Sequence, residues 1–112
     1  MIFILGGYAA GKRSYVRDVL GYTDDQMADG ELSDKPVVYN VQDMAARFPP
    51  DELLAALCQK DVVIANEVGA GVIPIDKDQR LAREAAGRLS VLLAQRAQRV
   101  IRIVCGLPME LK

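Results

Sequence analysis

The residues with the clearest chemical meaning lie at the start of the chain. A fully apolar run at 1–5 leads directly into the sequence GGYAAGK at 6–12, which is followed by Arg13 and Ser14. This order indicates a buried strand, a glycine-rich loop and the first turn of a helix. The residues expected to line a nucleotide-binding loop are Gly6, Gly7, Tyr8, Ala9, Ala10, Gly11, Lys12, Arg13 and Ser14.

The spacing Gly-x-x-x-x-Gly-Lys is that of a phosphate-cradling P-loop. Glycines let successive backbone N–H groups converge on phosphate oxygens, and a helix N-terminus adds positive potential. Lys12 would reach the terminal phosphates and act as a catalytic residue. The next position normally holds a Ser or Thr that binds Mg²⁺, but here it is Arg13. Ser14 comes one residue late and is turned by about 100° on a helix. The sequence therefore identifies no metal ligands. The expected cofactor is ATP or GTP, and whether Mg²⁺ accompanies it stays open.

A second candidate group follows another apolar run, at 62–66. Asn66, Glu67, Gly69 and Gly71 come directly after it. Ligands of open α/β sheets bind beyond the carboxyl ends of strands, so Glu67 and Lys12 are expected at one edge. Glu67 would be catalytic: it could organise Mg²⁺-bound water, position a substrate hydroxyl or accept its proton. The structural alternative is a glutamate that caps the turn through backbone N–H groups.

Periodicity gives the elements that must position these residues. The apolar runs predict strands, and amphipathic stretches predict helices. The acidic stretch at 23–36 is interpreted as a solvated loop with room for a short helical turn. The pattern is strand 2–6, helix 12–20, strand 36–41, helix 51–59, strand 61–66, helix 77–98, strand 100–105 and a short tail. Alternating strands and helices favour a parallel sheet with right-handed crossovers. We expect a single α/β domain over residues 1–112, a three-layer P-loop NTPase-like fold with a mainly parallel sheet of about four or five strands.

Composition narrows the function classes. About half of the residues are apolar and the net charge is −1, which predicts no general attraction to nucleic acid or to membranes. No apolar run approaches the roughly 20 residues of a membrane span, and no basic region precedes the first apolar run. We therefore expect a cytoplasmic protein. Cys58 and Cys105 are expected to be buried free thiols, and the chain contains no histidine.

Several segments together resemble the adenosylcobinamide kinase / adenosylcobinamide-phosphate guanylyltransferase family. Residues 65–74, ANEVGAGVIP, are similar to its T-N-E-V-G-x-G-[IV]-[VI]-P segment. Residues 86–94, AGRLSVLLA, resemble its A-G-R-x-N-Q-x-L-A run, and residues 104–112, VCGLPMELK, resemble its V-S-G-[IL]-P-x-x-[IL]-K ending. The likeness covers residues 1–20 and 62–112 and is poor in the middle of the chain.

The resemblance implies an enzyme of coenzyme B12 assembly that is cytoplasmic, Mg²⁺-dependent and homo-oligomeric. Such enzymes phosphorylate the adenosylcobinamide hydroxyl with ATP or GTP, and then transfer GMP from GTP through a guanylyl-histidine. This chain departs from that pattern because it is much shorter, lacks every histidine and has Arg13 at the metal-binding position. Guanylyl transfer by the histidine route is thus not expected from these residues.

Three functional hypotheses remain open. In the first, the chain is a P-loop nucleotide-binding protein that phosphorylates adenosylcobinamide, with a corrinoid and a purine nucleotide as partners. In the second, it is a catalytically degenerate regulatory or scaffold protein that binds a nucleotide or a corrinoid. In the third, it is a degenerate fold whose P-loop is empty. Thermal stabilisation by nucleotides would separate the first two hypotheses from the third, and release of ADP in the presence of a corrinoid alcohol would separate the first from the second.

Overall fold

The computed structural model describes residues 1–67 and 76–112. Within them the chain forms a sheet of six strands in the order β2-β3-β4-β1-β5-β6. All neighbouring pairs are parallel except β5 and β6. The strands are β1 (Ile2–Gly6), β2 (Met27–Asp29), β3 (Val37–Tyr39), β4 (Val62–Asn66), β5 (Arg99–Val104) and β6 (Leu107–Glu110).

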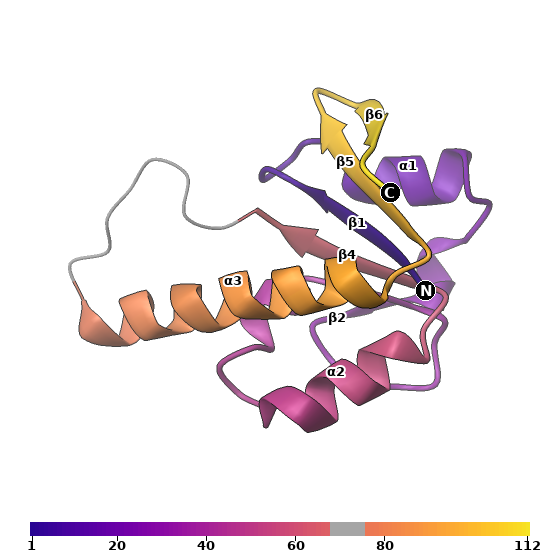
Figure 1. The fold of residues 1–112 in the computed structure, drawn as a ribbon. Coiled ribbons are helices and arrows are strands. Elements are labelled where there is room, and N and C mark those ends of the chain that lie inside the picture. The colour runs from indigo at the N-terminus through magenta and orange to yellow at the C-terminus, as the bar shows by residue number, and fades with distance from the viewer. Residues whose placement is uncertain (68–75) are drawn as a thin grey trace.

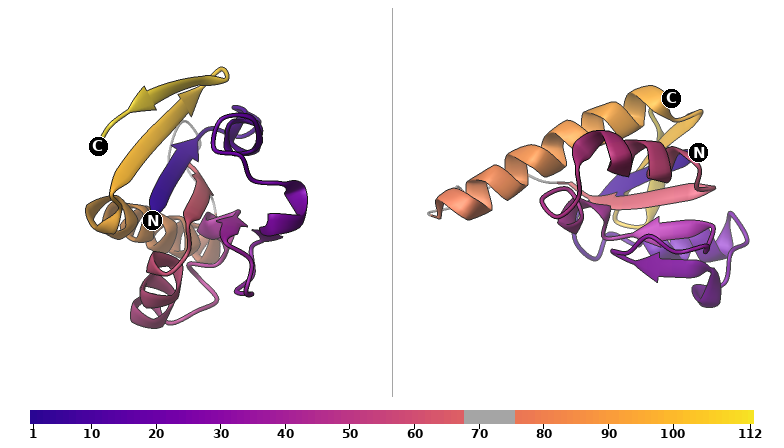
Figure 2. Two further views of the ribbon diagram at one scale, coloured as in Figure 1. Left: turned by 90° about the vertical axis from the view of Figure 1, so that its right-hand side faces the viewer. Right: turned by 90° about the horizontal axis from the view of Figure 1, so that it is seen from below.

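Helices cover both faces of this sheet (Figure 1 and Figure 2). The α-helices are α1 (Lys12–Asp18), α2 (Pro50–Cys58) and α3 (Lys77–Arg96), and two 3-10 turns are η1 (Asp24–Gln26) and η2 (Val41–Asp43). One face carries α1, and the other carries α2 and α3. This gives three layers with β1 in the interior of the sheet, and it confirms the predicted α/β class. None of the helices in the described ranges has the length and apolar character needed to cross a membrane.

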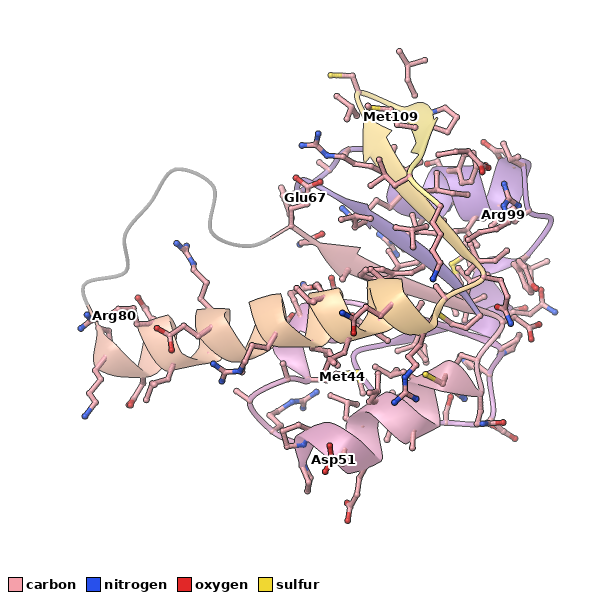
Figure 3. The ribbon with its side chains drawn as sticks, in the orientation of Figure 1. Met44, Asp51, Glu67, Arg80, Arg99 and Met109 are labelled. Atoms are coloured by element: carbon pink, nitrogen blue, oxygen red, sulfur yellow. The ribbon has the colours of Figure 1, made fainter. Side chains whose placement is uncertain are left out.

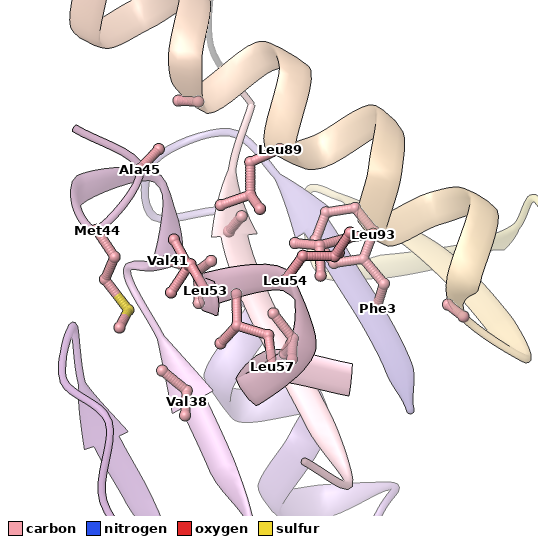
Figure 4. Close-up of a cluster of buried hydrophobic side chains, with 14 of the residues drawn as sticks. Phe3, Val38, Val41, Met44, Ala45, Leu53, Leu54, Leu57, Leu89 and Leu93 are labelled. Carbon is pink, nitrogen blue, oxygen red and sulfur yellow. The ribbon is translucent and has the colours of Figure 1, made fainter. Parts of the chain in front are cut away.

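The two faces of the sheet build two apolar clusters. On one face, Phe3 and Val63 pack with Leu57 of α2 and with Leu89 and Leu93 of α3 (Figure 4). On the other face, Val16 of α1 packs against the residues of the strands that point the opposite way, including Ile4, Ile64 and Ile101. Successive strand residues point to opposite faces, so the apolar run of β1 serves both clusters. This double packing fixes where β1 ends and the glycine-rich loop begins.

Several expectations from the sequence are corrected by the structure. The stretch at 23–36 contains the short helical turn η1 allowed by the sequence, but it also contains the short strand β2, which was not expected. The tail after 105 forms the antiparallel strand β6, whose side chains are all exposed. Cys105 is exposed and Cys58 half-buried, so neither thiol is fully buried. Leu81, near the start of α3, is 51% exposed although it is apolar, since the first turns of α3 project beyond the sheet (Figure 1).

Candidate phosphate-binding cleft

The glycine-rich loop joins the end of β1 to the start of α1. Two of its residues have positive backbone φ, Ala9 at 57° and Gly11 at 96°. Gly11 occupies the N-cap position, where its carbonyl accepts the N–H of Tyr15 at 3.0 Å. A glycine at this position avoids the steric cost that a side chain meets in the left-handed region. The P-loop pattern therefore produces a sharp strand-to-helix turn at this point.

The β5–β6 turn holds the loop from the side. The Gly106 N–H donates to the Ala10 carbonyl at 2.8 Å, and a Cβ built on Gly11 would lie 3.4 Å from the Gly106 Cα. At the end of β1, a Cβ on Gly6 would lie only 2.6 Å from the Ile103 carbonyl oxygen. The first glycine is thus required by the close approach of β5, and the loop is braced by residues far away in sequence.

Lys12 is the one charged residue that is buried within the described parts of the chain, at 8% exposure. Its Nζ donates to the Gly7 carbonyl at 2.6 Å. Burial lowers the pKa of the Lys12 ammonium; of the two nearby charges, Glu67 raises that pKa and Arg13 lowers it. No carboxylate of the described residues pairs with this ammonium within 4.0 Å. An ammonium has three donors, so the geometry leaves Lys12 able to bind a further acceptor.

A cleft of about 640 Å³ opens between the P-loop, α1 and the carboxyl ends of β2, β3 and β4. Seven of the nine residues expected from the sequence line it, from Tyr8 to Ser14, whereas Gly6 and Gly7 do not. The remaining lining residues are Arg17, Asp29, Tyr39, Asn40, Ile64 and Asn66. Three lining residues are cations and a single one, Asp29, is a carboxylate. The charge of the cleft therefore favours an anionic ligand.

The side chains that follow Lys12 do not offer a metal ligand beside it. The Arg13 guanidinium lies over the Tyr39 ring, 4.6 Å from its centroid. The Ser14 hydroxyl accepts a hydrogen bond from Arg17 Nη2 at 3.2 Å, and Arg17 Nη1 also pairs with Asp24 at 3.1 Å. The residues at this position therefore fit a cationic phosphate site better than a Mg²⁺ site.

Glu67 lies just after β4, near the end of β1, as Figure 3 shows. Its backbone N–H donates to the Gly6 carbonyl at 2.8 Å. Its carboxylate accepts from Arg102 Nε at 2.5 Å and from Arg102 Nη2 at 3.1 Å. Glu67 is not among the residues that line the cleft, although its charge acts on Lys12. The predicted loop of Gly69 and Gly71 lies outside the described residues.

Asp29 and Asn40 are cleft residues that the sequence analysis missed. Asp29 ends β2 and Asn40 directly follows β3. The signal was weak, because it consisted of the short apolar pair Met27 and Ala28 before Asp29, inside a stretch dominated by acidic residues. The parallel pairing of β2 with β3 then brings both side chains to the carboxyl edge of the sheet, where ligands bind.

Comparison with known proteins identifies the family. The family model described as cobinamide kinase / cobinamide phosphate guanyltransferase matches residues 50–111. The chain is 39% identical over 61 residues to the bifunctional adenosylcobalamin biosynthesis protein CobP of Pseudomonas aeruginosa, covering 54% of this chain and 35% of that protein.

It is also similar to the proteins named CobU in two other bacteria. The identity is 37% over 65 residues to that of Salmonella typhimurium, with 54% of this chain and 36% of the relative covered. The identity to the CobU protein of Escherichia coli is 35% over 78 residues, with 66% of this chain and 42% of the relative covered. These matches therefore cover less than half of the length of each relative. The segment that the family model matches runs from α2 to β6. Because the family model covers more than half of the chain, this protein belongs to the cobinamide kinase / cobinamide phosphate guanyltransferase family.

Proposed function

We propose that the cleft binds the phosphates of a purine nucleoside triphosphate, ATP or GTP. The observation that carries this proposal is the buried Lys12 ammonium, where the glycine-rich loop enters α1. Among the described residues, its hydrogen-bond partner is one backbone carbonyl, that of Gly7. Burial of a cation without a paired carboxylate is unfavourable, and a bound anion relieves that cost. Arg13 and Arg17 add positive charge along the same cleft.

The proposed reaction is transfer of the terminal phosphate to the hydroxyl of adenosylcobinamide. Family membership supports this choice, and the relatives carry names of bifunctional adenosylcobalamin biosynthesis proteins. Lys12 would hold the terminal phosphate and neutralise the charge that develops during transfer. The role of Glu67 as a catalytic carboxylate stays a prediction. Guanylyl transfer through histidine is not proposed, because the chain has no histidine.

The nucleotide proposal is tested by thermal unfolding in the presence of ATP, GTP, GDP and tripolyphosphate, each with and without Mg²⁺. A ligand present at 100 times its dissociation constant stabilises the folded state by about 2.7 kcal/mol. Lys12→Ala should remove most of that gain, whereas the exposed Lys77→Ala should keep it. The proposal is wrong if no nucleotide or phosphate raises the melting temperature at millimolar concentration.

One observation favours a second candidate, a catalytically degenerate protein that binds a nucleotide or a corrinoid as a regulator or scaffold. Arg13 stands where a metal-binding hydroxyl is expected, and it contacts Tyr39. Nucleotide binding without release of ADP or GDP in the presence of adenosylcobinamide would support this candidate over the kinase. The expected homo-oligomeric state is a separate prediction, which sedimentation velocity would test.

A further inference from the structure

The cleft has a second polar end, at the carboxyl ends of β2 and β3, formed by Asp29 and Asn40. The Asn40 side-chain Nδ2 donates to Asp29 Oδ1 at 2.6 Å. Asp29 is the one carboxylate among the residues that line the cleft. A carboxylate accepts about four hydrogen bonds, and Asn40 uses one of them. This leaves Asp29 able to accept hydrogen bonds from a ligand in the cleft.

A chain of amides fixes the orientation of this pair. The Asn66 backbone N–H donates to Gln42 Oε1 at 2.9 Å, so the other end of the Gln42 amide must be its Nε2 donor. Gln42 Nε2 donates to Asn40 Oδ1 at 3.4 Å. The Asn40 amide therefore presents its NH₂ group to Asp29, and this direction is set by the backbone donor at the end of β4. The network thus directs one donor of Asn40 at the exposed Asp29 carboxylate.

The backbone around the pair is held as well. The Gly30 N–H donates to the Tyr39 carbonyl at 2.8 Å, and Arg47 Nη2 donates to the Gly30 carbonyl at 2.5 Å. Asn40 itself has a φ of 57°, a region that asparagine tolerates better than most residues. These contacts keep the ends of β2 and β3 together at the rim of the cleft.

The position of Asp29 separates it from the phosphates. Two strands, β3 and β4, lie between β2 and β1. Three strand spacings of about 4.8 Å put the end of β2 roughly 14 Å from the end of β1. A metal ion bound at the P-loop, with ligands near 2.1 Å, does not bridge such a span. Asp29 would also repel a phosphate. A neutral donor on another part of the ligand would meet no such repulsion.

We propose that Asp29, oriented by Asn40, is a hydroxyl-binding subsite of the cleft. It would accept hydrogen bonds from an alcohol at the end of the ligand opposite the phosphates. This inference rests on the proposed nucleotide site. The alcohol has two sources, the ribose of the nucleotide and the hydroxyl of the phosphate acceptor, and the chemistry of recognition is the same for both.

Equilibrium binding of three probes tests the subsite: ATP or GTP, tripolyphosphate, and cobinamide added to nucleotide-loaded protein. Asp29→Asn keeps the size of the side chain but removes its charge. If the alcohol is the ribose, this variant should weaken nucleotide binding by roughly 10-fold or more, as for a lost hydrogen bond to a charged group, and leave tripolyphosphate unchanged. If the alcohol belongs to the acceptor, cobinamide binding should weaken by a similar factor, with both other affinities unchanged.

Two further variants control the interpretation. Asp25→Asn makes the same charge change at an exposed residue of η1 that does not line the cleft, and it should change none of the affinities. Asn40→Gly suits the positive φ but removes the amide, and it should weaken the same probe as Asp29→Asn by a smaller factor.

The outcomes separate the two proposals. If the unaltered protein binds neither a nucleotide nor tripolyphosphate, the nucleotide site and the subsite both fall. If it binds them and Asp29→Asn changes no affinity, or weakens tripolyphosphate as much as the nucleotide, the hydroxyl subsite alone is overturned.

Discussion

Glu67 and Arg102 form a two-point ion pair across the strand that leads into the P-loop. Arg102 donates through Nε at 2.5 Å and through Nη2 at 3.1 Å to the two carboxylate oxygens. Glu67 follows β4 and Arg102 lies in β5, and β1 runs between them. The pair therefore ties together the two neighbours of β1 where the glycine-rich loop begins. It gives Glu67 a structural partner in addition to its predicted catalytic role.

Two variants separate these roles of Glu67. Glu67→Gln should lower any phosphoryl transfer by roughly 10²-fold if its carboxylate takes part, as for a lost general base. Arg102→Met breaks the same pair but keeps the carboxylate, so it should retain most of the rate. Because both side chains are partly exposed, each change should leave the stability to urea almost unchanged.

Steady-state rates and urea unfolding of both variants are the measurements. Equal loss of rate in Glu67→Gln and Arg102→Met would assign the effect to the ion pair and remove the catalytic role of Glu67.

The lowered pKa of Lys12 predicts a pH dependence of both stability and binding. The folded state releases this proton at a lower pH than the unfolded chain, whose lysine has its ordinary pKa of 10.5. Between the two pKa values the unfolded state binds more protons, so the contribution of Lys12 to the free energy of unfolding rises with pH. Phosphate affinity should fall in the same window, because the bound anion requires the charged ammonium.

Nucleotide dissociation constants from pH 7 to pH 10.5 test this sign. Lys12→Arg is the control, since its guanidinium stays charged over that range. The nucleotide affinity of the Lys12→Arg variant will differ in absolute value, but it should vary less with pH than the affinity of the unaltered protein. Parallel pH profiles in both proteins would show that Lys12 does not carry the effect.

Arg13 predicts a weak effect of Mg²⁺ on nucleotide binding. Its guanidinium stands at the hydroxyl position of the motif and contacts Tyr39, so no protein hydroxyl beside Lys12 is offered to the metal. Arg13→Ser should increase the ratio of nucleotide affinities measured with Mg²⁺ and with EDTA. Tyr39→Leu removes the ring but keeps the arginine, and its ratio should stay close to that of the unaltered protein. A strong Mg²⁺ requirement before any substitution would contradict this interpretation.

Two adjacent glycines should respond differently to the same added methyl group. At Gly6, a Cβ would lie 2.6 Å from the Ile103 carbonyl oxygen, a backbone atom that cannot swing away. Gly6→Ala should therefore destabilise the fold by about 1–3 kcal/mol, the usual cost of overpacking. At Gly7, a Cβ meets nothing within 4 Å, so Gly7→Ala should leave stability almost unchanged. Chemical unfolding of the two variants gives the comparison, and equal stabilities would mean that β5 can move away from β1.

The absence of histidine predicts that GTP does not guanylylate this chain. A phosphoramidate to imidazole cannot form without the ring. Intact-mass spectrometry after incubation with GTP and Mg²⁺ should show the unmodified mass. A gain of one GMP would reveal an acceptor of another type, such as a lysine.

The parts of the fold that could be predicted are those with long apolar runs or with glycine and proline residues at their boundaries. The strands β1, β4 and β5 and the glycine-rich loop have such signals. The strands β2 and β6 have no such signal. Both are short, and β6 has no buried side chain that would produce an alternation of apolar and polar residues. Pairing with β3 and β5 defines them, and this is information from tertiary structure.

The same limit applied to the site. The loop residues are consecutive, so their spacing predicted a phosphate site directly. The contact of Arg13 with Tyr39 and that of Asp29 with Asn40 join different elements. Neither contact has a spacing that periodicity could detect. The ion pair of Glu67 with Arg102 was likewise missed, because it requires the order in which β4, β1 and β5 lie side by side.

The hydrogen bond between the β5–β6 turn and the P-loop affects when, during synthesis and folding, the protein can first bind a nucleotide. The Ala10 carbonyl is held by the N–H of Gly106, so the loop reaches its final shape only after a contact that spans most of the chain has closed. Such distant closures are slow steps in folding. During synthesis, a ribosome-bound chain lacking residues 99–110 would have the complete glycine-rich sequence but not its support. Nucleotide binding by nascent chains should therefore begin late, once the C-terminal hairpin has emerged.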